Sequence, residues 1–148
     1  MIKDKNSNNQ NKFSTAIEKI LFLKGIDIFS DTNPDALLQV ASVSDEIKIP
    51  GNENIFHEGD PSIYLYLVVS GKVTISRQER EIFTALPNES FGLIGLVEER
   101  RRATSAAATE ESTLLRIRYS DLFDLMEDYP SITRGVLRGV SLIVRKLL

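Results

Sequence analysis

The sequence of 148 residues contains no cysteine, no tryptophan and only one histidine, His57. The lack of cysteine excludes disulfides, thiolate zinc sites and cysteine nucleophiles. A single histidine cannot form a histidine metal cluster and argues against a His-paired catalytic relay, so we expect no bound metal. Carboxylate catalysis needs no histidine, but Glu98 and Glu99 are adjacent and would point to opposite faces of a strand. We therefore expect no enzymatic activity.

The sequence also has no large excess of charge of either sign and no long apolar run. The chain has 18 basic and 21 acidic residues, and a net charge of −3 argues against a general nucleic-acid binder. The longest apolar-rich stretch, residues 136–148, contains Arg138, Arg145 and Lys146, and is too short and too charged to span a bilayer. Residues 1–12 are polar and lack the apolar core of a signal peptide. These features predict a cytoplasmic protein without membrane insertion.

The length predicts a single domain. Residues 1–12 are rich in Asn and Lys and are predicted to form a disordered leader or linker, with the domain over residues 13–148. A helical period follows, with Ile17, Ile20, Leu21 and either Leu23 or Lys24 expected on one face. Asn33, Pro34 and Asp35 then provide an N-cap, a first helical residue and a favourable negative charge. The apolar face of this second helix is expected to contain Leu37, Leu38, Val40 and Ala41.

Residues 46–118 change to β character. Short strands are predicted near residues 46–49, 54–56, 63–69, 72–76, 81–86 and 113–118. Ser70-Gly71, between two of these runs, predicts a tight hairpin. Six or more short strands at this spacing indicate an antiparallel barrel or sandwich.

The last part of the chain returns to helix. Ser120 is expected to cap a helix over residues 121–127, and Pro130 to begin another that runs to residue 148. The second of these helices has an apolar face and a basic face, and its Gly135 and Gly139 allow close packing. The predicted fold class is thus α+β, mainly β, with helices before and after the strands. The apolar face is formed by Ile132, Val136, Val140, Ile143 and Leu147, and the basic face by Arg134, Arg138, Ser141 and Arg145.

Residues 91–108 contain the pattern that is most indicative of a binding site. Gly92 and Gly95 allow close backbone approach, and residues 93–97 can form one helical turn whose free N–H groups attract an anion. Residues 100–102 are three arginines that can fold back onto such an anion, because the guanidinium matches a phosphate bidentately. The same residues also fit an ordinary turn, a solvated charged loop and a tightly packed strand of small residues.

From residue 20 onward, the chain resembles the cyclic nucleotide-binding domains of catabolite activators, gated channels and cyclic-nucleotide-dependent kinases. The resemblance rests on Glu58-Gly59-Asp60 and on Ser70-Gly71-Lys72-Val73, which are structural turn motifs in that family. It implies an antiparallel β-roll, jelly-roll-like, flanked by N-terminal and C-terminal helices.

The family's phosphate-binding cassette also aligns with this chain without a gap. Arg102 stands at the phosphate arginine, whereas Leu93 replaces the glutamate that accepts the ribose 2′-hydroxyl and Arg101 replaces a proline. Loss of a charged hydrogen bond should weaken binding of a ribose cyclic phosphate by roughly 10- to 100-fold. The resemblance therefore implies a ligand site made of Gly92, Leu93, Ile94, Gly95, Arg102 and Ala103.

The implied function is a regulatory module that senses a small phosphate ligand, a cyclic nucleotide, and biases an attached or partner effector. The alternative is a degenerate module of the same fold that binds no nucleotide and acts in interaction, including a homodimer through the C-terminal helix. Leu93 favours that alternative. An enzyme of the related cupin barrels would need a histidine-rich metal site. DNA binding would need a helix-turn-helix beyond Leu148, so nucleic-acid binding by this chain alone is not expected.

Overall fold

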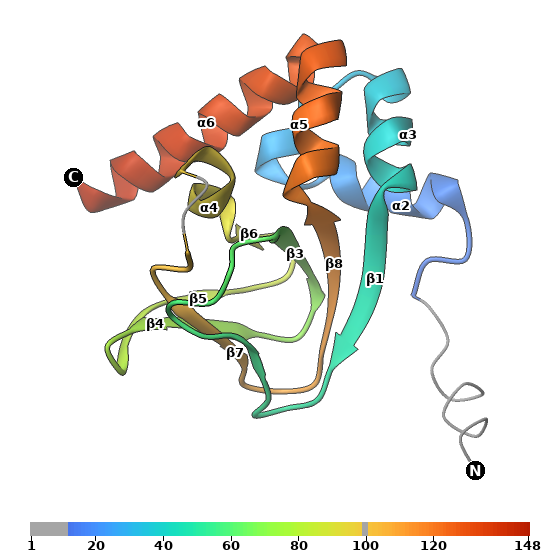
Figure 1. Cartoon of the computed structure of the whole chain (residues 1–148). Coiled ribbons are helices and arrows are strands. Elements are labelled where there is room, and N and C mark those ends of the chain that lie inside the picture. The colour runs from blue at the N-terminus through green and yellow to red at the C-terminus, as the bar shows by residue number, and fades with distance from the viewer. Residues whose placement is uncertain (1–11, 99–100) are drawn as a thin grey trace.

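Short strands occupy the centre of the molecule, and helices gather at one end of them (Figure 1). The computed structural model describes residues 12–98 and 101–148. The leader predicted for residues 1–12 lies outside the described residues except for Lys12, so this domain boundary stays a prediction. The elements are α2 (Ala16–Lys24), the 3-10 helix η1 (Asp27–Phe29), α3 (Pro34–Ser42), β1 (Ser44–Ile49), β2 (Asn54–Phe56), β3 (Tyr64–Ser70), β4 (Val73–Arg77), β5 (Arg80–Ala85), β6 (Ser90–Phe91), α4 (Leu93–Glu98), β7 (Ser105–Ala108), β8 (Ser112–Arg118), α5 (Tyr119–Asp128) and α6 (Pro130–Leu147).

The strands form two antiparallel sheets, with the orders β1-β8-β3-β6 and β2-β7-β4-β5. The expected antiparallel β-roll, with helices before and after it, is confirmed. Both faces of β3 are covered. Leu65 and Leu67 belong to the core cluster under the helices, whereas Tyr66 and Val68 belong to the cluster inside the roll. Alternate side chains of a strand point to opposite faces, which explains why the sequence of β3 is almost continuously apolar.

The tight hairpin predicted at Ser70-Gly71 is wrong. β3 pairs with β6 and β8, whereas β4 pairs with β5 and β7, so this turn takes the chain from one sheet to the other. Gly71 has φ of +93°, and a Cβ there would overlap Ser112. The glycine thus meets a packing requirement rather than a hairpin requirement. The hairpin partner of β4 is β5, joined through Gln78 and Glu79, both at positive φ without a glycine.

One predicted helix cap is confirmed and the other is wrong. Asn33 accepts a hydrogen bond of 2.9 Å from the Ala36 amide, and Pro34 is the first helical residue. In contrast, α5 begins one residue before the predicted cap, Ser120, which lies inside the first turn. The reason is that the Tyr119 amide donates to the Ile63 carbonyl at 2.8 Å, so the chain passes directly from β8 into the helix.

The apolar faces of the two N-terminal helices were predicted only in part. Ile17 and Leu21 on α2, and Leu38 on α3, are exposed. Residues 17 and 21 are one turn apart and share a face, but α2 packs on α3 and the core through the other face, which contains Leu23. Periodicity identified the helices but did not select which apolar stripe of α2 is covered.

α6 is seated on its own chain through its glycines. A Cβ on Gly135 would overlap the Ile28 carbonyl oxygen, and a Cβ on Gly139 would lie 2.7 Å from Leu93 Cδ2. The helix therefore crosses closely over η1 and the start of α4 (Figure 1). Arg138, on the basic face, pairs with Asp31 and donates to Ser30 Oγ. No helix within residues 12–98 and 101–148 is long and apolar enough to cross a bilayer.

We expect Gly135→Ala to lower the free energy of unfolding by about 1–3 kcal/mol, because α6 must move away from Ile28. Thermal unfolding followed by circular dichroism measures this change. Ser141→Ala, at an exposed position of the same helix, is the control and should stay within about 0.5 kcal/mol of the parent. Equal stability of the two variants would contradict the close seating of α6.

Candidate functional site

A cavity of about 540 Å³ lies between the β4–β5 hairpin, the segment from β6 into α4, and the last turns of α6. This volume is in the range of small-molecule sites. The sequence-predicted site residues all line it, namely Gly92, Leu93, Ile94, Gly95, Arg102 and Ala103. The structure thus brings both halves of the predicted cassette to one cavity, although Arg100, which was part of the predicted arginine cluster, lies outside the described residues. The role of these residues in ligand binding stays a prediction.

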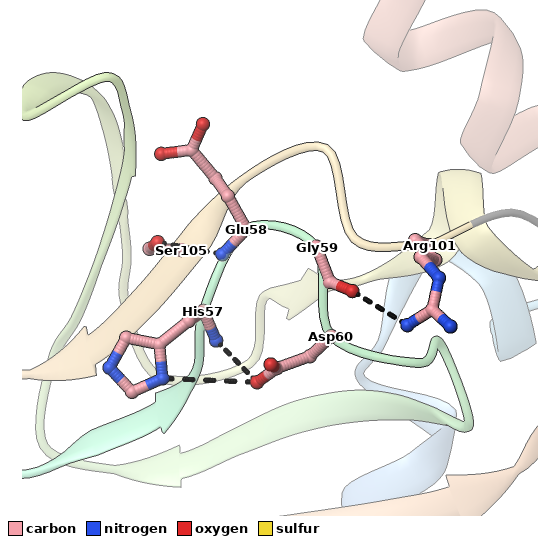
Figure 2. Close-up of polar contacts among 6 residues, drawn as sticks. All are labelled: His57, Glu58, Gly59, Asp60, Arg101 and Ser105. Atoms are coloured by element: carbon pink, nitrogen blue, oxygen red, sulfur yellow. Dashed lines mark hydrogen bonds and ion pairs between the residues drawn. The ribbon is translucent and has the colours of Figure 1, made fainter.

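The backbone of Arg102 is fixed by the Glu58-Gly59-Asp60 turn. The Gly59 amide donates to the Arg102 carbonyl, and the Arg102 amide donates to the Asp60 carbonyl, each at 2.8 Å. Arg101 adds a third bond, from Nη1 to the Gly59 carbonyl at 2.9 Å (Figure 2). The resemblance had implied only a structural turn here. The structure shows that this turn positions the arginine of the site.

The turn is itself held by side chains (Figure 2). Asp60 accepts a hydrogen bond of 2.8 Å from the His57 amide, and its carboxylate lies 3.8 Å from His57 Nδ1. The Glu58 amide donates to Ser105 Oγ at 3.0 Å, which ties the turn to β7. His57 is largely exposed, and its contacts are those of a turn residue.

The side chain of Arg102 is directed at protein groups. Only 7% of the residue is exposed. Nη2 donates to the Tyr64 carbonyl at 2.7 Å, and Nη1 donates to the Tyr119 hydroxyl at 3.0 Å. The guanidinium carbon lies 4.0 Å from the centre of the Phe56 ring, within the range of a cation–π interaction.

This guanidinium has no carboxylate partner among the side chains that the structure describes. Its Nε is buried and, within the same residues, makes no hydrogen bond. A buried charge is costly unless it is paired, and one carbonyl, one hydroxyl and an aromatic ring replace water only in part. The arrangement is therefore suited to attract an anion to the wall of the cavity.

Tyr119 connects the arginine to the glycine half of the cassette. Its hydroxyl donates to the Gly92 carbonyl and accepts from Arg102. Gly95 leaves room for this hydroxyl, because a Cβ there would lie 2.6 Å from it. Burial raises the pKa of Tyr119, and the nearby positive charge of Arg102 opposes this shift. Sequence reasoning missed Tyr119, since a tyrosine at the end of a strand gives no signal of such a role.

Gly92 brings the backbone next to the arginine. It has φ of +87°, in the left-handed region that favours glycine, and a Cβ would lie 2.9 Å from Arg102 Nη1. The first residue of α4, Leu93, is only 4% exposed and belongs to the core cluster beneath the helices. Ile94 and Ala103 are exposed at the cavity. Leu93 therefore joins α4 to α6 as well as lining the site.

Comparison with known proteins agrees with this geometry. The family profile of the cyclic nucleotide-binding domain matches residues 46–129. The chain belongs to this family of regulatory ligand-binding domains. It is 32% identical over 130 residues to a cyclic AMP receptor protein of Thermus thermophilus, a match that covers 84% of this chain and 59% of the relative. A cAMP-dependent protein kinase regulatory subunit of Hypocrea atroviridis is 28% identical over 125 residues, 81% of this chain and 27% of that protein.

Solved structures show the same fold. The catabolite activator protein of Thermus thermophilus superimposes with a TM-score of 0.75 at 29% identity, covering 82% of this chain and 59% of the other. The sensor domain of the transcriptional regulator DNR from Pseudomonas aeruginosa gives 0.78 at 19% identity, with 88% and 91% covered. The chain spans less than two thirds of the length of the curated relatives named above.

We expect Tyr119→Phe to lower the free energy of unfolding by about 1–3 kcal/mol at neutral pH, because Gly92 and Arg102 lose a hydrogen-bond partner. A raised pKa means that the folded state holds the phenol proton more tightly than the unfolded state does. The stabilisation is complete below the usual tyrosine pKa of about 10 and is lost as pH rises through the folded-state value.

Thermal melts from pH 8 to pH 11 test this prediction. The decline of the parent above pH 10 should be shallower in Tyr119→Phe but not abolished, because burial also raises the pKa of Tyr66. Tyr129→Phe, which removes a phenol outside the hydrogen bonds to Arg102 and Gly92, is the matched control. Identical alkaline profiles of Tyr119→Phe and the parent would show that this hydroxyl does not contribute.

Proposed function

We propose that this chain is a cytoplasmic regulatory domain that binds a cyclic nucleotide in the 540 Å³ cavity, with the cyclic phosphate at Arg102 and the backbone of residues 92–95. The observation that supports it best is the buried guanidinium without a described carboxylate partner, next to the positive-φ glycine. Two relatives whose names include cyclic AMP support the choice of ligand. The proposed role is regulatory rather than enzymatic.

Ligand binding would change the partners of Arg102. A phosphate competes with the Tyr64 carbonyl and the Tyr119 hydroxyl, and a charge-assisted hydrogen bond is about twice as strong as a neutral one. Release of Tyr119 from the arginine alters the support of Gly92, directly before α4. Because Leu93 of α4 lies next to Gly139 of α6, a displacement of α4 would also alter the packing of α6. A ligand acts in this way only if it binds the two arrangements with different affinity.

Leu93 sets a limit on affinity. The side chain provides no acceptor for a sugar hydroxyl, and its burial in the core cluster next to Gly139 leaves no simple way to restore one. Leu93→Glu would place a carboxylate in this apolar contact and destabilise the fold. Substitutions of Arg102 are therefore the sharper test of binding.

The effector is the remaining part of the proposal. Because the named relatives are much longer than the match, we propose that α6 transmits ligand occupancy to a further domain or to a partner protein. A second candidate, an interaction module that binds no nucleotide, is favoured by the burial of Leu93 and by the exposed apolar side chains of Leu137 and Val144 on α6. It would be a homodimer that does not respond to nucleotides.

We expect saturable thermal stabilisation by cyclic AMP or cyclic GMP, of about 2.7 kcal/mol at a ligand concentration of 100 times the Kd. Arg102→Lys should remove most of this shift, because a lysine cannot make the bidentate contact. Arg118→Lys, on an arginine outside the cavity lining, should respond like the parent. Each variant is compared with its own ligand-free melting temperature.

Isothermal titration calorimetry of the parent makes the test independent of the variants. The absence of both heat and stabilisation at millimolar cyclic AMP and cyclic GMP would contradict the proposed function. If the same protein is then dimeric by light scattering, the interaction module is the better description.

A further inference from the structure

The walls of the cavity are predominantly apolar, and this feature is not required by a phosphate site. Apolar side chains come from the β4–β5 hairpin on one side and from α4 and α6 on the other. Phe83 and Ile82 on β5 are 45% and 52% exposed, and Ile94 on α4 is also exposed. Exposed apolar side chains lie around one cavity, and covering them with a ligand lowers the free energy of the system. A ligand with an apolar body satisfies this condition.

The charged groups of the cavity indicate the sign of the ligand. Arg101, Arg102 and Lys146 line it together with two carboxylates, Asp27 and Glu89. Glu89 accepts a hydrogen bond of 2.8 Å from the Leu86 amide, so this carboxylate is occupied in a turn. Among the lining residues that the structure describes, one positive charge remains in excess, and a ligand with a single negative charge would balance it.

Arg101 and Lys146 are the cations open to solvent. Both are exposed, whereas Arg102 is buried among aromatic rings and already donates to two protein oxygens. Arg101 donates one hydrogen bond through Nη1, to the Gly59 carbonyl, and Lys146 lies in the last turn of α6. These two exposed side chains are therefore more accessible to an anionic group that enters from solvent than the buried Arg102 is.

We propose that the cavity binds small carboxylates with an apolar body, of the medium-chain fatty acid class, as a further ligand. The chain of the ligand lies between β5 and α6, and its carboxylate lies at Arg101 and Lys146. The proposal assumes, with the proposed function, that this cavity is the regulatory site, but it names a different ligand chemistry. A sugar has hydroxyl groups that the apolar walls leave without partners, whereas an alkyl chain has none.

Calorimetric titration with decanoate, below its micelle concentration, tests this proposal. Decanoate should bind saturably, near one molecule per chain, and cyclic AMP should compete with it. Acetate, which provides only the charge, and decanol, which provides only the chain, should each bind at least about tenfold more weakly. Decanol that binds as tightly as decanoate would overturn the assignment of a charged ligand.

Matched variants locate the binding site. Phe83→Asp should weaken decanoate binding about tenfold, whereas Leu86→Asp, at a similarly exposed residue outside the lining, should leave it unchanged. Lys146→Glu should weaken it about threefold or more, whereas Arg145→Glu, the adjacent exposed residue outside the lining, should not. Equal losses within either pair would show adsorption to the surface and overturn the proposal.

The outcomes separate this proposal from the proposed function. Binding of cyclic AMP without binding of decanoate overturns the apolar ligand and supports the nucleotide. Binding of decanoate without cyclic AMP supports the apolar ligand and overturns the nucleotide. Failure of both overturns both.

Discussion

The guanidinium of Arg102 is the point at which the separate parts of this domain meet. It stacks on Phe56 of β2, donates to the Tyr64 carbonyl of β3, and donates to Tyr119, where β8 passes into α5. Its backbone is held by the turn after β2. One charged side chain thus connects both sheets, the cassette and the C-terminal helices. Because a buried charge must be partnered, a change in what surrounds this group affects all of these elements.

A second constraint is the close packing of α6 against η1 and α4. The helix approaches η1 and α4 so closely that Gly135 and Gly139 have no room for a side chain. Leu93 occupies the space that Gly139 leaves, and its burial makes α4 part of the helical core. The residue that the family resemblance assigns to ligand recognition has become a packing residue here. The Leu93 side chain offers no hydrogen-bond acceptor, and its packing next to Gly139 connects the cavity to the C-terminal helix.

Local signals in the sequence predicted the parts of the fold that depend on local geometry. Asn33 and Pro34 define a helix start, and Gly92 was expected to allow the close backbone approach that the structure shows. The hairpin predicted at Ser70-Gly71 was wrong, because the sequence alone does not distinguish a glycine needed for close packing from one needed for a hairpin. The partners of Arg102 could not be predicted, since they are 17 and 38 residues away in sequence. Their meeting depends on strand order, which no local pattern encodes.

These constraints together define what a ligand must do. The donors of Arg102 are already satisfied in part, so a phosphate gains only the difference between a charge-assisted hydrogen bond and the neutral ones that it replaces. Strong binding therefore has to draw on the apolar walls, where Phe83 and Ile82 are exposed. The proposed regulation depends on the same exchange of hydrogen-bond partners. Under the proposed function, a ligand that takes Arg102 from Tyr119 would alter the support of Gly92, directly before α4.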